Sequence, residues 1–196
     1  YFMKNLQNRL NQVFERINDE KFLTGDTLGN EIGFWVFDYP AKHELLVRNH
    51  LKDVNDKLIK RGFRFEHLNI FEVLIEMLES RGLFARACDR EKQVGVDELR
   101  KTLAGPLSQD KVAQYIADQF KPTELDFVLL SGLGSAWPLV RGHELLSALQ
   151  DVMGPTPLVL FYPGEYSGMD LHPFGMIESK NYYRAFKLVP DDEKKN

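Results

Sequence analysis

The sequence predicts an α/β protein with three layers, in which helices flank a mostly parallel sheet that ends in a C-terminal antiparallel hairpin. Two observations support this. Short apolar runs typical of buried strands alternate with longer stretches whose apolar residues recur at helical spacing. Strands and helices in series form parallel sheets, because each helix carries the chain back across one face. We expect a single domain over residues 1–196, long enough to bury roughly 70% of its unfolded surface.

The amino-terminal third predicts helix, strand and helix in that order. Residues 3–24 carry apolar side chains on one helical face, with polar residues between them. Residues 31–39, EIGFWVFDY, are dense in aromatic and β-branched side chains and predict the first strand. Pro40 suits the first turn of the next helix, which we expect to end at Gly62.

The remaining elements follow from the same two patterns. Asn69 followed by Glu72 matches a capping box, and Ser108 is a second cap at a helix start. Gly and Pro separate the later segments. We expect strands at 64–68, 127–130 and 157–162, and helices after 69, 83, 96, 108 and 138. The carboxyl end is expected to hold an irregular stretch at 163–173, a hairpin that pairs 174–178 with 182–189, and a charged tail at 190–196.

Composition excludes several classes of function. A formal net charge of −4 does not favour bulk electrostatic binding of nucleic acid, and Cys88, the only cysteine, cannot form an intramolecular disulfide. The longest apolar tract, residues 127–140, is too short to span a bilayer and contains two glycines and a proline. The amino end lacks the apolar core of a signal peptide. We expect a cytoplasmic protein without a membrane segment.

The loop over residues 131–135, SGLGS, is the first place to look for function. It joins an expected strand to an expected helix, and such loops at the carboxyl ends of strands bind ligands and partners in α/β sheets. A dinucleotide site would need a third glycine where Trp137 stands, and no P-loop lysine follows Gly132 or Gly134. Phosphate binding would depend on backbone N–H groups alone.

Other motifs are weak. Glu178 and Lys180 match half of a metal-dependent nuclease signature, for which Asp38 is the available second acid. Asp38 itself predicts a helix cap, with a metal or hydroxyl ligand as the alternative. Arg184 interrupts an apolar face, which predicts either a structural pair with Asp38 or Glu165 or a contact with an anion or partner. Ser131 lacks the preceding glycine of a nucleophile elbow, so a serine hydrolase is disfavoured.

A series of motifs resembles the BrxB family, a small component of the bacterial BREX phage-exclusion systems. The resemblance covers nearly the whole chain, and the combination is more specific than any one piece. The residues that carry it are WVFDYP (35–40) with Glu44, Ser131-Gly132, Trp137-Pro138, Arg141, Pro163-Gly164-x-Tyr166-x-Gly168 and Asn181-Tyr182-Tyr183-Arg184-Ala185-Phe186. Residues 169–172, MDLH, depart from the more polar pattern of that loop.

The resemblance implies an accessory, non-catalytic component without a cofactor or metal. It implies protein partners: an alkaline-phosphatase-like PglZ protein above all, then an adenine methyltransferase and a large ATPase. We therefore expect an adaptor, with a degenerate nucleotide or anion sensor and a divergent nuclease as alternatives. The expected partner or anion surface is Ser131, Gly132, Gly134, Trp137, Arg141, Gly164, Tyr166, Gly168, Tyr182, Tyr183 and Arg184, and a polar cluster is expected at Asp38 and Glu44.

Overall fold

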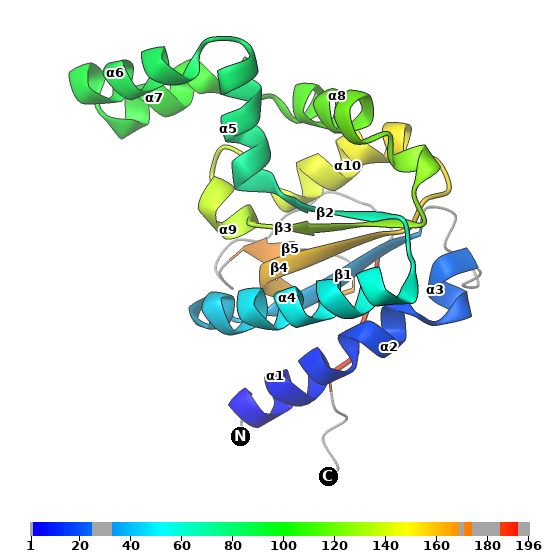
Figure 1. The fold of residues 1–196 in the computed structure, drawn as a ribbon. Helices are drawn as coiled ribbons and strands as arrows, with labels where there is room; N and C mark the ends of the chain where they lie inside the picture. The colour runs from blue at the N-terminus through cyan, green and yellow to red at the C-terminus, as the bar shows by residue number, and fades with distance from the viewer. Residues whose placement is uncertain (1, 25–32, 169–170, 174–184, 192–196) are drawn as a thin grey trace.

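Five parallel strands form the centre of the computed structural model, which describes residues 2–24, 33–168, 171–173 and 185–191 (Figure 1). Their order across the sheet is β2-β3-β4-β1-β6, and β5 pairs antiparallel with β4 at one end. The strands are β1 (Phe34–Tyr39), β2 (Phe65–Asn69), β3 (Phe127–Ser131), β4 (Leu158–Tyr166), β5 (Leu171–Pro173) and β6 (Phe186–Lys187). The predicted α/β class is confirmed.

One face of the sheet is covered by the amino-terminal helices together with α4 (Figure 1). Their apolar faces pack on strand residues that include Phe37, Phe127 and Phe161. The helices are α1 (Phe2–Asn11), α2 (Val13–Ile17), α3 (Glu20–Thr24) and α4 (Glu44–Arg61), with a 3-10 turn, η1 (Ala41–His43), before α4. Gly62 ends α4 in the left-handed conformation, as expected from its position.

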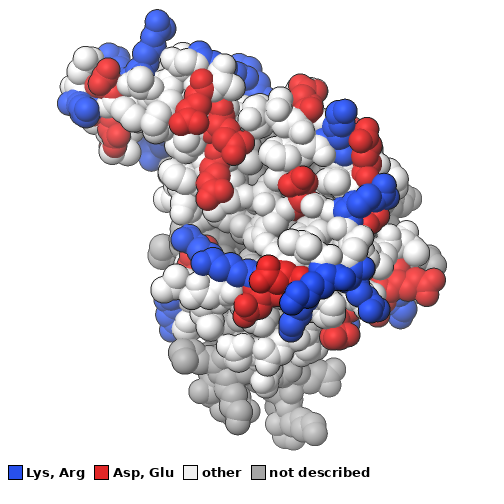
Figure 2. Space-filling model, viewed as in Figure 1, with Lys and Arg blue, Asp and Glu red and all other residues white. Residues whose placement is uncertain are grey.

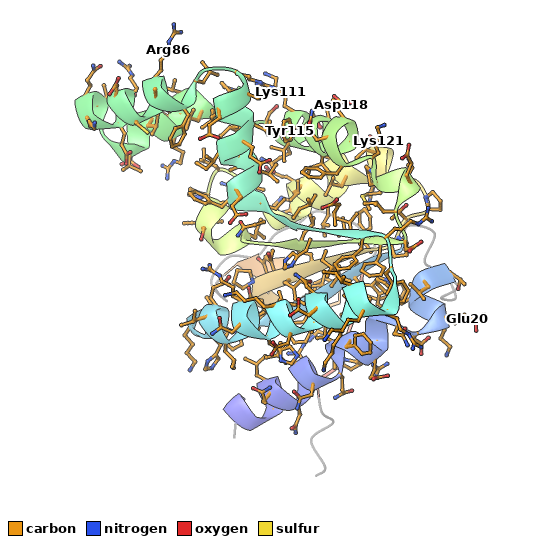
Figure 3. The ribbon with its side chains drawn as sticks, viewed as in Figure 1. Glu20, Arg86, Lys111, Tyr115, Asp118 and Lys121 are labelled. Atoms are coloured by element: carbon orange, nitrogen blue, oxygen red, sulfur yellow. The ribbon has the colours of Figure 1, made fainter. Side chains whose placement is uncertain are left out.

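The opposite face is covered by a longer set of helices that connect β2 to β3 and β3 to β4. Helices α6 and α7 extend away from the sheet beyond α5, and the labelled Tyr115 of α8 lies toward α5 (Figures 1 and 3). Its hydroxyl donates to Glu76 on α5 at 3.5 Å. The elements are α5 (Ile70–Ser80), α6 (Phe84–Val94), α7 (Val96–Leu103), α8 (Gln109–Phe120), η2 (Pro122–Glu124), α9 (Leu133–Ala136) and α10 (Gly142–Met153).

Two buried apolar clusters, one on each side of the sheet, explain this arrangement. Residues alternate between them along the strands: Leu129 belongs to the cluster under α4, while Val128 and Leu130 belong to the cluster under α5 and α10. Because both faces are covered, β3 is an unbroken apolar run rather than an alternating one. The sequence pattern for strands in this protein follows directly from that double burial.

The amino-terminal segment corrects one prediction. Three short helices, α1, α2 and α3, replace the single helix expected over 3–24. The break between α2 and α3 has a local cause. The Asp19 carboxylate accepts a hydrogen bond from the Lys21 N–H at 2.8 Å, and this bond competes with continuation of the helix. The apolar face survives the breaks, because Leu10, Val13 and Ile17 are all fully buried.

The carboxyl-terminal segment differs from the prediction at β4. This strand continues four residues beyond the expected end at 162, and its extension pairs with β5, where an irregular stretch was expected. The expected hairpin lies largely outside the described residues, because 174–184 are not described. The described part of its second arm, β6, pairs in parallel with β1.

Candidate functional site

The predicted site residues that are described gather at the carboxyl edge of the parallel sheet. Strands β1, β2, β3 and β4 all end there, because they are parallel and in register: Asn69 lies beside Ser131, and Tyr39 beside Pro163. The edge therefore brings together loops that are far apart in sequence. We use "carboxyl edge" below for these strand ends and the turns that follow them.

Asn69 and Gly132 fix the turn after β3. The Asn69 carboxamide caps α5, accepting hydrogen bonds from the N–H groups of Phe71 at 3.0 Å and Glu72 at 3.4 Å. Gly132 has φ of +77°, and a Cβ there would overlap that carboxamide. A glycine is required at this position for both reasons, conformation and space.

Gly134 brings the same turn against β4. A Cβ at Gly134 would lie 3.3 Å from Cγ of Pro163, so the glycine permits a close approach between this turn and β4. The helix that follows the turn, α9, has only four residues. The Gly132-x-Gly134 pattern is thus explained by contacts within the protein, which weakens the expectation of a phosphate site.

Aromatic and charged side chains are exposed around this turn. Trp137, directly after α9, is 39% exposed, and Phe71, in the first turn of α5, is 41% exposed. Arg141 and Ser135 are also exposed, and α9 packs against α5. Phe71 was not among the predicted site residues, since its helical pattern suggested an inward position. The structure instead places its ring outward at the carboxyl edge.

Tyr166 does not belong to the exposed part of the predicted surface. Its side chain is 2% exposed, and its hydroxyl donates to the Ala185 carbonyl at 2.6 Å. Gly164 is likewise buried, whereas Gly168 is exposed. Burial here follows from the extension of β4, which directs Tyr166 inward where a loop would have exposed it. This corrects the expected partner surface at these two positions.

Asp38 is the centre of a buried ionic cluster. Its carboxylate is bound by Arg9 Nη2 at 2.7 Å and lies 3.2 Å from Lys187 Nζ, and it accepts the Tyr166 backbone N–H at 3.1 Å. Arg9 also donates to the carbonyl groups of Asp38 and Val189. Asp38 therefore does not cap the following helix, and its role differs from the predicted one.

The cluster extends to the solvent through Asp191. Lys187 Nζ donates to this carboxylate at 2.8 Å, and Arg9 Nη1 lies 3.4 Å from it. Burial opposes the charged form of Lys187, but the bonds and charges of Asp191 and Asp38 outweigh it and raise the pKa of the lysine. Burial likewise opposes the charge of Asp191, yet Lys187 and Arg9 lower its pKa.

Glu44 belongs to a different contact from Asp38. It accepts a hydrogen bond from the Tyr39 hydroxyl at 2.5 Å and lies 3.7 Å from Arg48. Burial, strengthened by the neighbouring Glu44 carboxylate, raises the pKa of Tyr39 well above its usual range. Adjacent strand residues point to opposite faces, so Asp38 and Tyr39 meet different partners. The predicted cluster of Asp38 with Glu44 is not formed.

A second polar chain crosses the sheet edge at β2 and β3. His67 Nε2 lies 2.8 Å from Ser131 Oγ, and His67 Nδ1 lies 2.7 Å from Nδ2 of Asn55 on α4. Burial lowers the pKa of His67, which favours the neutral imidazole. The sequence did not predict these contacts, because His67 lies 12 positions from Asn55 and 64 positions from Ser131, and the three residues share no local motif.

Several predicted residues lie outside the described part of the chain. Tyr182, Tyr183 and Arg184 are among them, as are Glu178 and Lys180 of the nuclease half-motif. Asp38, the acid that this motif would need, is already bound by two cations. In the described residues, no group of three or more His, Cys, Asp or Glu is arranged to hold a metal ion.

Known proteins similar to this chain all point to one family. The family model described as BREX protein BrxB matches residues 66–188. The chain belongs to the BrxB family. The BREX protein BrxB of Escherichia coli O9:H4 (strain HS) is 56% identical over 186 residues, covering 95% of this chain and 92% of the relative. The BREX protein BrxB of Bacillus cereus (strain H3081.97) is 38% identical over 192 residues, covering 95% and 99%.

Membership of the BrxB family gives the biological context. Proteins of this family are BREX components, which implies a role in phage defence. No solved structure matches the chain. The two relatives extend over the carboxyl-edge loops as well as the core, so the family resemblance seen in the motifs is confirmed over most of the chain.

Replacing Asp38 is expected to destabilise the fold strongly. Asp38→Ala leaves Arg9 and Lys187 without their buried partner, and such a loss costs about 3–5 kcal/mol. The matched control is Asp191→Ala, which removes a carboxylate that contacts the same two cations but is 60% exposed; we expect a loss below about 1 kcal/mol. Urea denaturation measures both values. Equal losses would contradict a central role for Asp38.

Gly132→Ala is expected to destabilise more than a glycine replacement without a steric conflict. Alanine at a left-handed position costs about 1–2 kcal/mol, and displacing the Asn69 cap adds about 1 kcal/mol. The control is Gly62→Ala, where φ is +85° but nothing lies within 4 Å of the added methyl group. Thermal unfolding of the two variants compares them. A smaller effect at Gly132 would show that Asn69 moves aside freely.

Proposed function

We propose that this BrxB protein is an adaptor in a BREX phage-defence assembly, and that it binds a PglZ-like protein of the alkaline-phosphatase family through its carboxyl edge. The proposal joins two lines of support. Family membership supplies the defence system, and the exposed residues of the edge supply the surface. The methyltransferase and the ATPase of the same system are further partners in this proposal, and the cytoplasm is the compartment.

The observation that carries the proposal is the exposure of two large aromatic side chains, Trp137 and Phe71, together with that of Arg141. Tryptophan and arginine are enriched among residues that dominate binding energy, and aromatic rings are enriched at interfaces generally. Both rings are about 40% exposed, although large apolar side chains of the neighbouring turns, such as Leu133, are buried. Covering them on a partner would remove apolar surface from water.

Contacts within the protein hold the backbone under these rings, which favours their use in binding. Trp137 follows a turn whose shape is set by the contacts of Gly132 with Asn69 and of Gly134 with Pro163. Phe71 lies in a helix that the same asparagine caps. A surface held in place before binding loses less conformational entropy on association. The exposed residues of the edge therefore suit a specific partner.

Charge supports a protein partner over nucleic acid. Acidic side chains of α5, including Glu72, Glu76 and Glu79, are exposed, and basic and acidic side chains are interspersed along α4 (Figure 2). Phosphate backbones are bound by concentrated basic surfaces. Among the described residues, no helix is both long enough and apolar enough to cross a membrane.

Trp137→Ala is expected to weaken the complex with the PglZ-like protein at least tenfold, because a buried tryptophan at a binding centre contributes 1.4 kcal/mol or more. Phe71→Ala should act in the same direction. Co-purification identifies the complex, and titration calorimetry then measures its dissociation constant. Circular dichroism checks that each variant is folded.

The matched control is Val96→Ala on α7. Val96 is an apolar side chain that is 64% exposed, so its removal changes exposed apolar area away from the carboxyl edge. The Val96→Ala variant should bind the PglZ-like protein with the same dissociation constant as the unchanged protein. If Trp137→Ala and Phe71→Ala bind as tightly as Val96→Ala, the partner does not use this surface. If the unchanged chain binds no PglZ-like protein at all, the adaptor proposal itself is wrong.

A further inference from the structure

We propose that Ser131 is a nucleophile whose hydroxyl is activated by His67, that Asn55 orients the imidazole, and that the site accepts an acyl group from an ester. This inference goes beyond the adaptor function and does not depend on it. It also revises the expectation of a non-catalytic protein, which followed from the family resemblance and from the absence of a local serine-hydrolase motif.

The distances are those of a nucleophile, a base and an orienting group. Ser131 Oγ lies 2.8 Å from His67 Nε2, and the other ring nitrogen lies 2.7 Å from the Asn55 carboxamide. A nucleophile and base within 2.6–3.2 Å, with the base held by a third group, is the arrangement that activates serine. Three separate elements supply the residues: β3, β2 and α4.

The proposal requires one orientation of the Asn55 carboxamide, because that orientation sets which ring nitrogen of His67 carries the proton. With its nitrogen facing His67 Nδ1, its oxygen is buried and has no hydrogen-bond partner in the described part of the chain. In the proposed site the amide is turned over, so that the oxygen faces Nδ1 and accepts the ring N–H, and the amide nitrogen takes the position without a partner. Nε2 is then an acceptor, and the Ser131 hydroxyl donates to it. Burial keeps the pKa of His67 low, so the ring is neutral and basic at this nitrogen.

The position of Ser131 suits chemistry at the surface of the sheet. It is the last residue of β3 and is only partly buried, in contrast to the four apolar residues before it. Gly132 turns the chain sharply after it, and α9 follows. Ser131 itself is still paired with Asn69 in the sheet, and its hydroxyl faces His67 on the neighbouring strand.

The reaction balances with water as the second substrate. Ser131 Oγ attacks the ester carbonyl carbon while its proton moves to His67 Nε2, and Asn55 Oδ1 holds the imidazolium through the Nδ1 proton. The C–O bond to the alcohol then breaks, and the alcohol leaves with the proton from Nε2. Water attacks the acyl-serine, again losing a proton to His67. The acid leaves, and Ser131 recovers its proton.

An alkyl fluorophosphonate tests the nucleophile directly in the full chain. Ser131 Oγ forms a bond to phosphorus, fluoride leaves, and the serine proton passes to His67. Intact-mass and peptide mass spectrometry should find one adduct, on Ser131. Ser131→Ala should abolish it, while Ser135→Ala, which removes a more exposed serine of the same turn, should be labelled at the unchanged rate.

His67→Gln separates activation from a structural hydrogen bond. Glutamine can still bond to Ser131 but cannot act as a general base, so labelling should slow at least about 100-fold. Asn55→Asp keeps an acceptor for the proton on Nδ1, so this variant should still be labelled. A long-range proton–nitrogen NMR spectrum of the unchanged protein should show the proton on Nδ1. Three results would each overturn the proposal: no adduct on Ser131, a labelling rate of His67→Gln equal to that of the unchanged protein, or an NMR spectrum with the proton on Nε2.

Discussion

The carboxylate of Asp38 is the interaction on which the edge of this sheet depends. It lies at the end of β1 in a buried position, 7% exposed, where an unpaired charge would be costly. Its cationic partners come from opposite ends of the chain: Arg9 from α1 and Lys187 from β6. Pairing this one carboxylate therefore ties both ends of the described chain to the same strand, and β6 joins the sheet beside β1.

This pairing divides the carboxyl edge into two parts. At the ends of β1 and β4 the polar groups of Asp38 and Tyr166 bind within the protein, since the Tyr166 N–H donates to Asp38 and its hydroxyl donates to the Ala185 carbonyl. Around β2 and β3 the edge is more open, with Trp137 and Phe71 exposed. The first part ties the two ends of the described chain to the sheet, and the second is the part that we propose binds a partner or substrate. Both functional inferences concern the second part.

Much of the fold could be predicted from the sequence, because burial on both faces leaves a direct record in apolar runs. The run at β3 and the helical spacing of α4 are examples, whereas α10 begins at Gly142 and not at Pro138 as expected. Asn69 is a second prediction that is confirmed. Glu72, three residues later, predicted that Asn69 caps a helix, and the Asn69 carboxamide does accept the Glu72 N–H. The same rule was wrong at Ser108, which precedes α8 but makes no side-chain capping hydrogen bond.

The polar contacts could not be predicted, because their partners are chosen by the folded chain. Arg9 reads as a solvated position in an amphipathic helix, yet it is 5% exposed and binds a carboxylate 29 positions away. His67, Ser131 and Asn55 lack any shared motif for the same reason. The buried Tyr166 was mistaken for a surface residue, since the pairing of β4 with β5 extends the strand through it.

The chain of Asn55, His67 and Ser131 calls for a physical reason. Apolar side chains packed between α4 and the sheet elsewhere on this face, as Leu51 and Leu129 are, need no hydrogen bonds and incur no desolvation cost. A polar chain in the same layer stabilises less than an apolar one unless every group is satisfied. In either orientation of the Asn55 carboxamide, one of its two polar atoms lies buried without a partner, which leaves these contacts short of that condition. Packing alone gives little reason for these three residues, and the proposed activation of the Ser131 hydroxyl by a neutral imidazole supplies one.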